Sequence, residues 1–298
     1  MKSQSLLLAI LLLFSIQLSA SHYVGGEIYW RCIQGTGKYI FYMDYYRDCG
    51  SSVGPQLNVS LSVSNTPRPN GNSLANIPMT FIPPDPGSPV GPFGGLAVQP
   101  TCQGCAGSSP ISCVVSDDGT LEKFSFRSQP ITLAGKPPSG NANDWLNGWV
   151  FSWQAPCCRS SDVTNIQNTG TTALFKAIMY GDGRASQDPC YDNSPEFKEQ
   201  PASLICDEYN FQFNHNATDL ELDSLNFSWA NVVNSTAGTN YTPVFNPWAS
   251  GFSINNPTPN ATTDLRNKPA TIDPKSGAIN MFVVLPSILS GSQVIFYV

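Results

Sequence analysis

Charged side chains are scarce in this sequence: Lys, Arg, Asp and Glu together make up 12% of the 298 residues. Surface helices are usually rich in such residues, while the 25 Pro and 24 Gly favour turns, so we expect little helix. The charges sum to −6 at neutral pH. This argues against a nucleic-acid surface, which needs a basic face to neutralise phosphates, and makes a divalent cation the more natural electrostatic partner.

Histidine is nearly absent, since the chain contains only His22 and His215. A Ser-His-Asp or Cys-His catalytic site would have to use one of these two residues. We interpret His215 as a structural residue. The paired carboxylates of a glycosidase need no particular spacing in the sequence, but nothing here positively suggests them. The sequence therefore favours a protein that is not an enzyme.

Long apolar runs are missing except at the amino terminus. There, Leu6 to Phe14 follow the positive Lys2 and precede the small residues Ser19 and Ala20. This pattern is typical of a signal peptide, so we predict that residues 1–20 are removed and that the mature chain is exported. No later stretch approaches the roughly twenty apolar residues of a membrane helix, so we expect no membrane span in this chain.

The remaining chain reads as short strands separated by turns. Residues 26–32 and 38–48 flank Gly35-Thr36-Gly37 and predict a hairpin. In the second strand, alternation predicts one face of Tyr39, Phe41, Met43 and Tyr45, and an opposite face of Ile40, Tyr42, Asp44 and Tyr46. Both faces are largely apolar or aromatic, as expected of a strand that is well covered in a sandwich.

A second aromatic strand contains Trp149, Phe151 and Trp153 on one face. We interpret these rings as sandwich core, because large rings dominate the energetics of burial. The alternative is a platform that stacks on sugars. Under that alternative the chain would be a carbohydrate-binding module or a glycosidase-associated domain, and the candidate tryptophans would be Trp145, Trp149, Trp153 and Trp248.

About 278 residues remain after the signal peptide, which is more than one compact domain usually holds. Gly181-Asp182-Gly183 and Asp188-Pro189-Cys190 mark a boundary. We therefore predict an all-β protein of two tandem β-sandwich domains. The first comprises residues 21–190 and the second residues 191–298.

Nine cysteines stand in this exported chain, where the disulfide is their default state. Cys102 and Cys105 have a zinc-like spacing, but they lack a second such pair and a nearby His, so we reject a zinc site. We predict that Cys190 and Cys206 form a disulfide, because they bracket the short segment that opens the second domain. The odd number leaves at least one cysteine free or bonded outside this chain.

Six short motifs follow one another along most of the mature chain. They are Ser21-His22-Tyr23-Val24-Gly25-Gly26-Glu27-Ile28, Tyr46-Arg47-Asp48-Cys49, Cys157-Cys158-Arg159, Asn193-Ser194-Pro195-Glu196-Phe197, Phe213-Asn214-His215-Asn216-Ala217-Thr218-Asp219 and Asp223-Ser224-Leu225. In their order and spacing they resemble the amino-terminal region of the large surface proteins of Bacteroidetes described as PKD-like or gliding-motility-associated.

This resemblance implies a module at the bacterial cell surface that has a structural or adhesive role and no catalytic activity. It implies that residues 191–298 form an immunoglobulin-like or cadherin-like domain. The expected partners are other surface proteins or extracellular glycans, and further domains of a longer polypeptide. Many such proteins carry a sorting domain of the type IX export system at their far carboxyl end, and we recognise none in this chain.

The segment from Asp219 to Leu225 resembles the Asp-x-Asp-Gly-Asp-Ser-Leu segment of cadherin-like modules. The resemblance implies a calcium site formed by Asp219, Glu221 and Asp223, since calcium prefers several oxygen ligands. Here Leu222 replaces the glycine and Glu221 replaces the middle aspartate, and these departures favour a solvated acidic turn instead. No cofactor is certain, and calcium is the candidate. Asp223-Ser224-Leu225 also resembles the O-glycosylation signal of Bacteroidetes, which implies modification at Ser224.

Overall fold

The protein is all-β in its computed structural model. The structure describes residues 23–51, 54–98, 112–113, 120–138, 148–156, 159, 163–168, 170–180, 190, 193–201, 208–236, 240–261 and 264–284. These residues form β1 (Tyr23–Ile33), β2 (Lys38–Asp48), β3 (Val59–Ser64), β4 (Asn76–Ile82), β5 (Leu96–Val98), β6 (Leu121–Ser128), β7 (Ile131–Thr132), β8 (Gly148–Gln154), β9 (Leu174–Tyr180), β10 (Glu196–Phe197), β11 (Asn210–Phe213), β12 (Ala217–Thr218), β13 (Val233–Thr236), β14 (Pro243–Phe245), β15 (Lys268–Ile272) and β16 (Ile279–Phe282). In this part of the chain there is no helix of the length and apolar character needed to cross a membrane.

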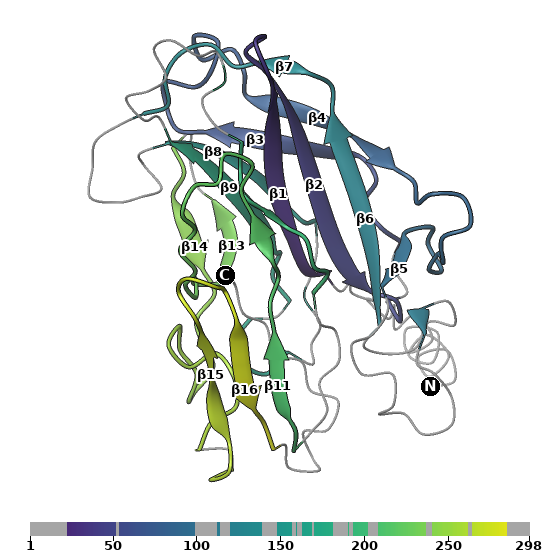
Figure 1. Cartoon of the computed structure of the whole chain (residues 1–298), viewed down its shortest axis with the longest axis vertical. Coiled ribbons are helices and arrows are strands. Elements are labelled where there is room, and N and C mark those ends of the chain that lie inside the picture. The colour runs from purple at the N-terminus through teal and green to yellow at the C-terminus, as the bar shows by residue number, and fades with distance from the viewer. Residues whose placement is uncertain are drawn as a thin grey trace, which may run out of the picture.

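One large antiparallel sheet contains the first nine strands. Its main order is β1-β2-β6-β4-β3-β8-β9, with β5 paired to β6 and β7 paired to β2. Figure 1 shows β1, β2 and β6 side by side, with β3, β8 and β9 behind them. The sheet is nearly closed, because Gly26 in β1 lies against the Phe175 ring of β9. A Cβ atom at residue 26 would stand 3.1 Å from that ring and 2.7 Å from the Asp44 carbonyl oxygen, so only glycine fits this seam.

The interior of this sheet is the main hydrophobic core. The predicted inner face of the second strand is confirmed: Tyr39, Phe41, Met43 and Tyr45 are all fully buried. Rings from the two layers meet there, since Phe41 lies 4.5 Å from Phe151 and Tyr45 lies 5.2 Å from Trp153, measured between ring centroids. Each buried side chain of this size stabilises the fold by roughly 1.5–3 kcal/mol.

Two disulfides are described, and one of them corrects the sequence-based prediction. Cys49 is bonded to Cys113, and Cys190 is bonded to Cys32 in β1. The predicted bond between Cys190 and Cys206 is therefore wrong, and Cys206 itself lies outside the described residues. The reason is spatial: the segment that follows Cys190 runs along β1, which brings that cysteine to a partner 158 residues away in sequence.

The remaining strands form three small sheets, ordered β10-β12, β11-β16-β15 and β13-β14. The three-stranded sheet has its own buried cluster of Ala270, Ile279 and Met281. A further cluster joins the two halves of the chain, because Val150 and Leu174 of the large sheet pack against Val233 and Tyr241. The predicted boundary at residue 190 lies in the sequence between β9 and β10, and the division into two domains stays a prediction. An immunoglobulin-like arrangement of residues 191–298 stays a prediction.

Candidate functional site

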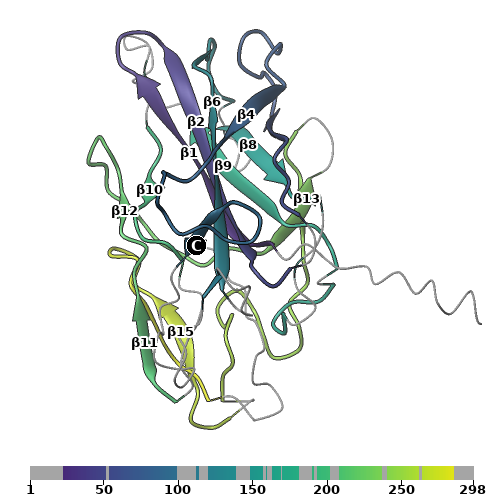
Figure 2. The same ribbon diagram turned by 90° about the vertical axis from the view of Figure 1, so that its right-hand side faces the viewer.

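The free edge of β1 is covered by the segment Asn193–Phe197, one of the motifs found in the sequence. The Cys32 amide donates to Asn193 Oδ1 at 2.6 Å, and the Trp30 amide donates to Ser194 Oγ at 2.8 Å. The Ser194 amide in turn donates to the Trp30 carbonyl oxygen at 3.1 Å. Figure 2 shows β10 beside β1. The segment Asn193–Phe197 thus satisfies backbone groups of β1 that would otherwise be free to pair with a strand of another chain.

A titratable carboxyl lies at this covered edge. Glu27 Oε2 accepts a hydrogen bond from the Phe197 amide at 3.2 Å, and Glu27 stands directly opposite Asp44 in the pairing of β1 with β2. Burial, and then the neighbouring charge of Asp44, raise the pKa of the Glu27 carboxyl to about 7. Asp44 is itself held by Lys123, whose Nζ lies 2.6 Å from Asp44 Oδ2. A carboxyl that changes charge near neutral pH is a candidate functional group.

A cavity of about 180 Å³ opens beside Glu27, at the seam where β1 meets β9. Phe175 and Lys176 line it from β9, Phe197 from the covering segment, and Asn231 from the loop before β13. Pockets that hold small molecules usually enclose roughly 300–1,000 Å³. The cavity is smaller, so it is a gap in the packing of the seam and not a pocket for a substrate of ordinary size.

The outer face of β1, β2 and β6 carries a row of side chains in register. Tyr29 stands opposite Tyr42, Tyr42 opposite Arg127, and Arg127 opposite Thr80 of β4. The two tyrosine rings are stacked, with centroids 5.0 Å apart and an interplanar angle of 9°. The guanidinium groups of Arg31 and Arg127 lie 5.6 and 5.9 Å from the Tyr42 centroid, within the range of cation–π attraction. Because Tyr29 and the arginines already lie against the Tyr42 ring, this row can bind a ligand through the outward edges of its rings and by hydrogen bonds.

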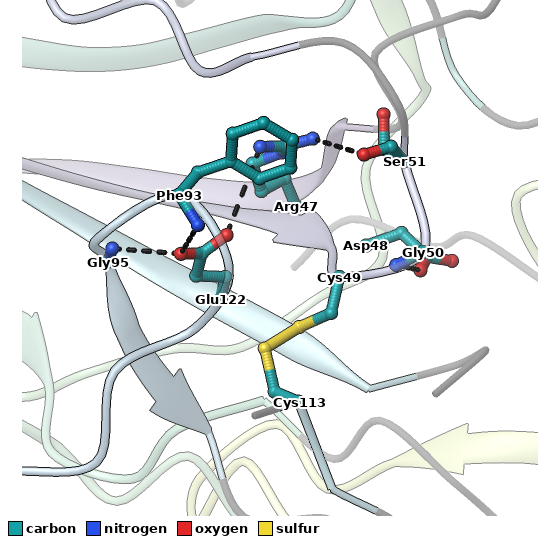
Figure 3. Close-up of a disulfide and its surroundings, with 9 residues drawn as sticks. All are labelled: Arg47, Asp48, Cys49, Gly50, Ser51, Phe93, Gly95, Cys113 and Glu122. Carbon is teal, nitrogen blue, oxygen red and sulfur yellow. Dashed lines mark hydrogen bonds and ion pairs between the residues drawn. A yellow bond between two sulfur atoms is a disulfide. The ribbon is translucent and has the colours of Figure 1, made fainter. Parts of the chain in front are cut away.

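Behind the outer face, the motif Tyr46-Arg47-Asp48-Cys49 has a structural role (Figure 3). Arg47 and Glu122 are fully buried, and Arg47 Nη1 lies 3.8 Å from Glu122 Oε2. Glu122 Oε1 accepts from the amides of Phe93 at 3.0 Å and Gly95 at 2.8 Å, and the Phe93 ring covers the guanidinium at 4.2 Å. The pair therefore fastens the loop before β5 to the sheet, next to the disulfide of Cys49.

Arg159, from the motif Cys157-Cys158-Arg159, fastens the two halves of the chain together. Its side chain is buried, and Nη1 donates to the Thr172 carbonyl oxygen at 2.6 Å while Nη2 donates to that of Val233 at 3.1 Å. Thr172 precedes β9 and Val233 begins β13. Cys157 and Cys158 lie outside the described residues.

His215 lies between two aromatic rings, as a structural residue would. Its ring centroid is 4.7 Å from those of both Phe197 and Phe213. Its carbonyl oxygen accepts from the amides of Lys198 and Glu199, each at 3.0 Å. Burial lowers the pKa of the His215 imidazole, which keeps the ring neutral at pH 7. His22, the other histidine, lies outside the described residues.

The acidic turn is closed by hydrogen bonds to the Asp219 carboxylate, and a calcium site in it stays a prediction. Asp219 Oδ1 accepts from the amides of Glu221 and Asp223, each at 3.0 Å, while Glu221 Oε1 accepts from the side-chain amide of Asn193. Over the ranges that the structure describes, no three His, Cys, Asp or Glu side chains form a group suited to a metal ion. Leu222 has a φ of 63° and is 89% exposed, so it adopts the left-handed conformation that favours glycine. Ser224 is exposed, and its glycosylation stays a prediction.

The tryptophans proposed for sugar binding have other roles. Trp149 and Trp153 belong to the core, with 0% and 6% exposure, so they are closed to a ligand and this part of the alternative is wrong. Trp248 is half-buried, and its Nε1 donates to Asn231 Oδ1 at 3.2 Å. Trp145 lies outside the described residues. Sequence reasoning missed the row through Arg127, because only the register between strands reveals it.

No protein-family model, no curated protein and no solved structure matches this chain. Its function is therefore inferred from its own residues and their geometry.

Proposed function

We propose that this chain is a secreted structural or adhesive module of a bacterial cell-surface protein and that it performs no catalysis. In this proposal the chain consists of two tandem β-sandwich domains, the second of them immunoglobulin-like and formed by residues 191–298. One observation supports the proposal most directly. The described polar residues of the sequence motifs bind one segment of the chain to another, and they do not converge on a substrate pocket.

Four of these residues illustrate the pattern. Arg47 binds the buried Glu122, Arg159 binds two backbone carbonyl groups, and Ser194 pairs with the backbone of β1. His215 is packed between aromatic rings and stays neutral. Buried polar contacts of this kind rigidify a fold and select one arrangement of its segments. A module that bears load or presents a surface outside the cell needs such rigidity.

The disulfides support a location outside the cytoplasm. Such bonds form and persist in oxidising compartments, and the bond between Cys32 and Cys190 ties the covering segment to β1. The amino-terminal sequence, with its expected signal peptide at residues 1–20, supports the same location.

The test is attachment by the exported chain, residues 21–298. Beads coated with the folded protein should retain intact bacteria or extracellular matrix, whereas beads coated with the reduced and unfolded protein or with albumin should not. Attachment equal to that of the albumin beads would overturn the adhesive function. Turnover of a glycoside or peptide that disappears in the Glu27→Gln variant would overturn the absence of catalysis.

A binding role for glycans is the second candidate, and the in-register row of Tyr29, Tyr42, Arg127 and Thr80 is the observation that favours it. It differs from the tryptophan platform expected from the sequence, because its rings stand on the outer face of the sheet.

A further inference from the structure

The outer-face row spans four strands. Neighbouring strands lie roughly 4.8 Å apart, so the line from Tyr29 through Tyr42 and Arg127 to Thr80 is roughly 14 Å long. Because all four residues are in register, their side chains leave the sheet at the same level. Arg127 and Thr80 are exposed and the two tyrosines are half-buried.

Positive charge is in excess around this row, although the whole chain carries −6. The carboxylate of Asp44 is bound by Lys123, and that of Glu196 is bound by both Arg31 and Lys198. Lys38 and Arg127 are exposed and form no ion pair with any described carboxylate. On the outer face of β1, β2 and β6, a further acid beside Asp44 is Glu27, which is only partly ionised at neutral pH. Lys38 and Arg127 are thus available to pair with the anionic groups of a ligand.

We propose that this outer face binds an acidic polysaccharide, whose carboxylate or sulfate groups pair with Arg127 and Lys38 while its sugar rings lie along Tyr29 and Tyr42. A guanidinium group can bind a carboxylate or sulfate through two parallel hydrogen bonds. The cation–π contact of Arg127 with Tyr42 restrains the arginine side chain, which lowers the entropy lost on binding. This inference rests on the proposed adhesive function and names the ligand class of that surface.

Two other classes of partner fit the face less well. A nucleic acid is disfavoured, because the net charge of −6 repels a polyanion as dense as a phosphate backbone. A peptide strand added to the sheet needs a free edge, and the edge of β1 is covered by the segment Asn193–Phe197. A polysaccharide with spaced charges can lie across the outer face of a sheet and needs neither a groove nor an edge.

The experiment measures binding of residues 21–298 to immobilised polygalacturonate, dextran sulfate and neutral dextran. We expect binding to at least one of the two acidic polymers, none to neutral dextran, and weaker binding as salt is added. Arg127→Ala and, independently, Lys38→Ala should each lower the affinity about tenfold, the effect of losing one charge-assisted hydrogen bond. Lys275→Ala, which removes an exposed cation from the turn between β15 and β16, is the matched control and should bind as the wild type does.

The outcomes separate this inference from the adhesive function. Equal binding of neutral and acidic polymers, or unchanged affinity in both folded variants, overturns the assignment of this face. If the wild-type protein binds neither acidic polymer while beads coated with it still attach to cells, the ligand class is wrong and the adhesive function stands. Loss of attachment together with intact polymer binding would overturn the adhesive function alone.

Discussion

Replacing Glu27 by glutamine tests the electrostatics of the covered edge of β1. The carboxyl is buried beside Asp44, and these two causes raise its pKa to about 7 from an ordinary value of 4.5. Between these two pH values the folded protein retains a proton that the unfolded chain has lost. Stability therefore falls as pH rises through this window, because ionisation is resisted in the folded state.

The magnitude follows from the size of the pKa shift. Each pKa unit corresponds to about 1.4 kcal/mol, so the full shift would be about 3 kcal/mol, and rearrangement around the new charge reduces it to about 1–3 kcal/mol. Glutamine stays neutral at every pH and its side-chain oxygen still accepts from the Phe197 amide. We expect the variant to match the wild type near pH 4.5 and to exceed its free energy of unfolding by about 1–3 kcal/mol at pH 8.5.

The assay is urea unfolding of both proteins, with disulfides intact, at several pH values from 4.5 to 8.5. Other titrating groups contribute equally to both proteins, so the difference between the two curves isolates Glu27. Glu199→Gln removes an exposed carboxyl just after the covering segment and is the control, for which we expect no comparable change between pH 4.5 and pH 8.5. A stability difference for Glu27→Gln that stays constant across this pH range would refute the reasoning.

The other predictions concern the disulfide of Cys190, the backbone at Leu222 and the buried side chain of Arg159. Non-reducing peptide mapping should recover Cys32 bonded to Cys190, and either cysteine in another bond would contradict the path of the covering segment. Because Leu222 has a left-handed φ and Leu220 does not, Leu222→Gly should be about 1 kcal/mol more stable than Leu220→Gly in thermal unfolding; equal values would show that the turn is unstrained. Arg159→Ala should lower the free energy of unfolding by about 2–4 kcal/mol, because it removes the hydrogen bonds of a buried guanidinium to the carbonyl oxygens of Thr172 and Val233. A loss below about 0.5 kcal/mol in urea unfolding would contradict that role.

Several features could be predicted from the sequence because they depend on neighbours along the chain. Alternation within a strand places successive side chains on opposite faces, so the buried face from Tyr39 to Tyr45 followed from the residue types alone. The same reasoning placed Trp149 and Trp153 in the core. The scarcity of charge and the abundance of Pro and Gly predicted an all-β chain, which the structure confirms for the residues it describes.

Other features were decided by tertiary structure. Cys190 pairs with Cys32, and not with the nearer Cys206, because the covering segment runs along β1. The raised pKa of Glu27 depends on burial and on Asp44 across the strand pair, neither of which is a property of the local sequence. The row through Arg127 exists only because β1, β2, β6 and β4 pair in one register. The sequence by itself determined which way each side chain points within its strand, since backbone geometry sets that locally. Which strands become neighbours depended on closing the sheet around its aromatic core, and that closure involves residues far apart in the chain.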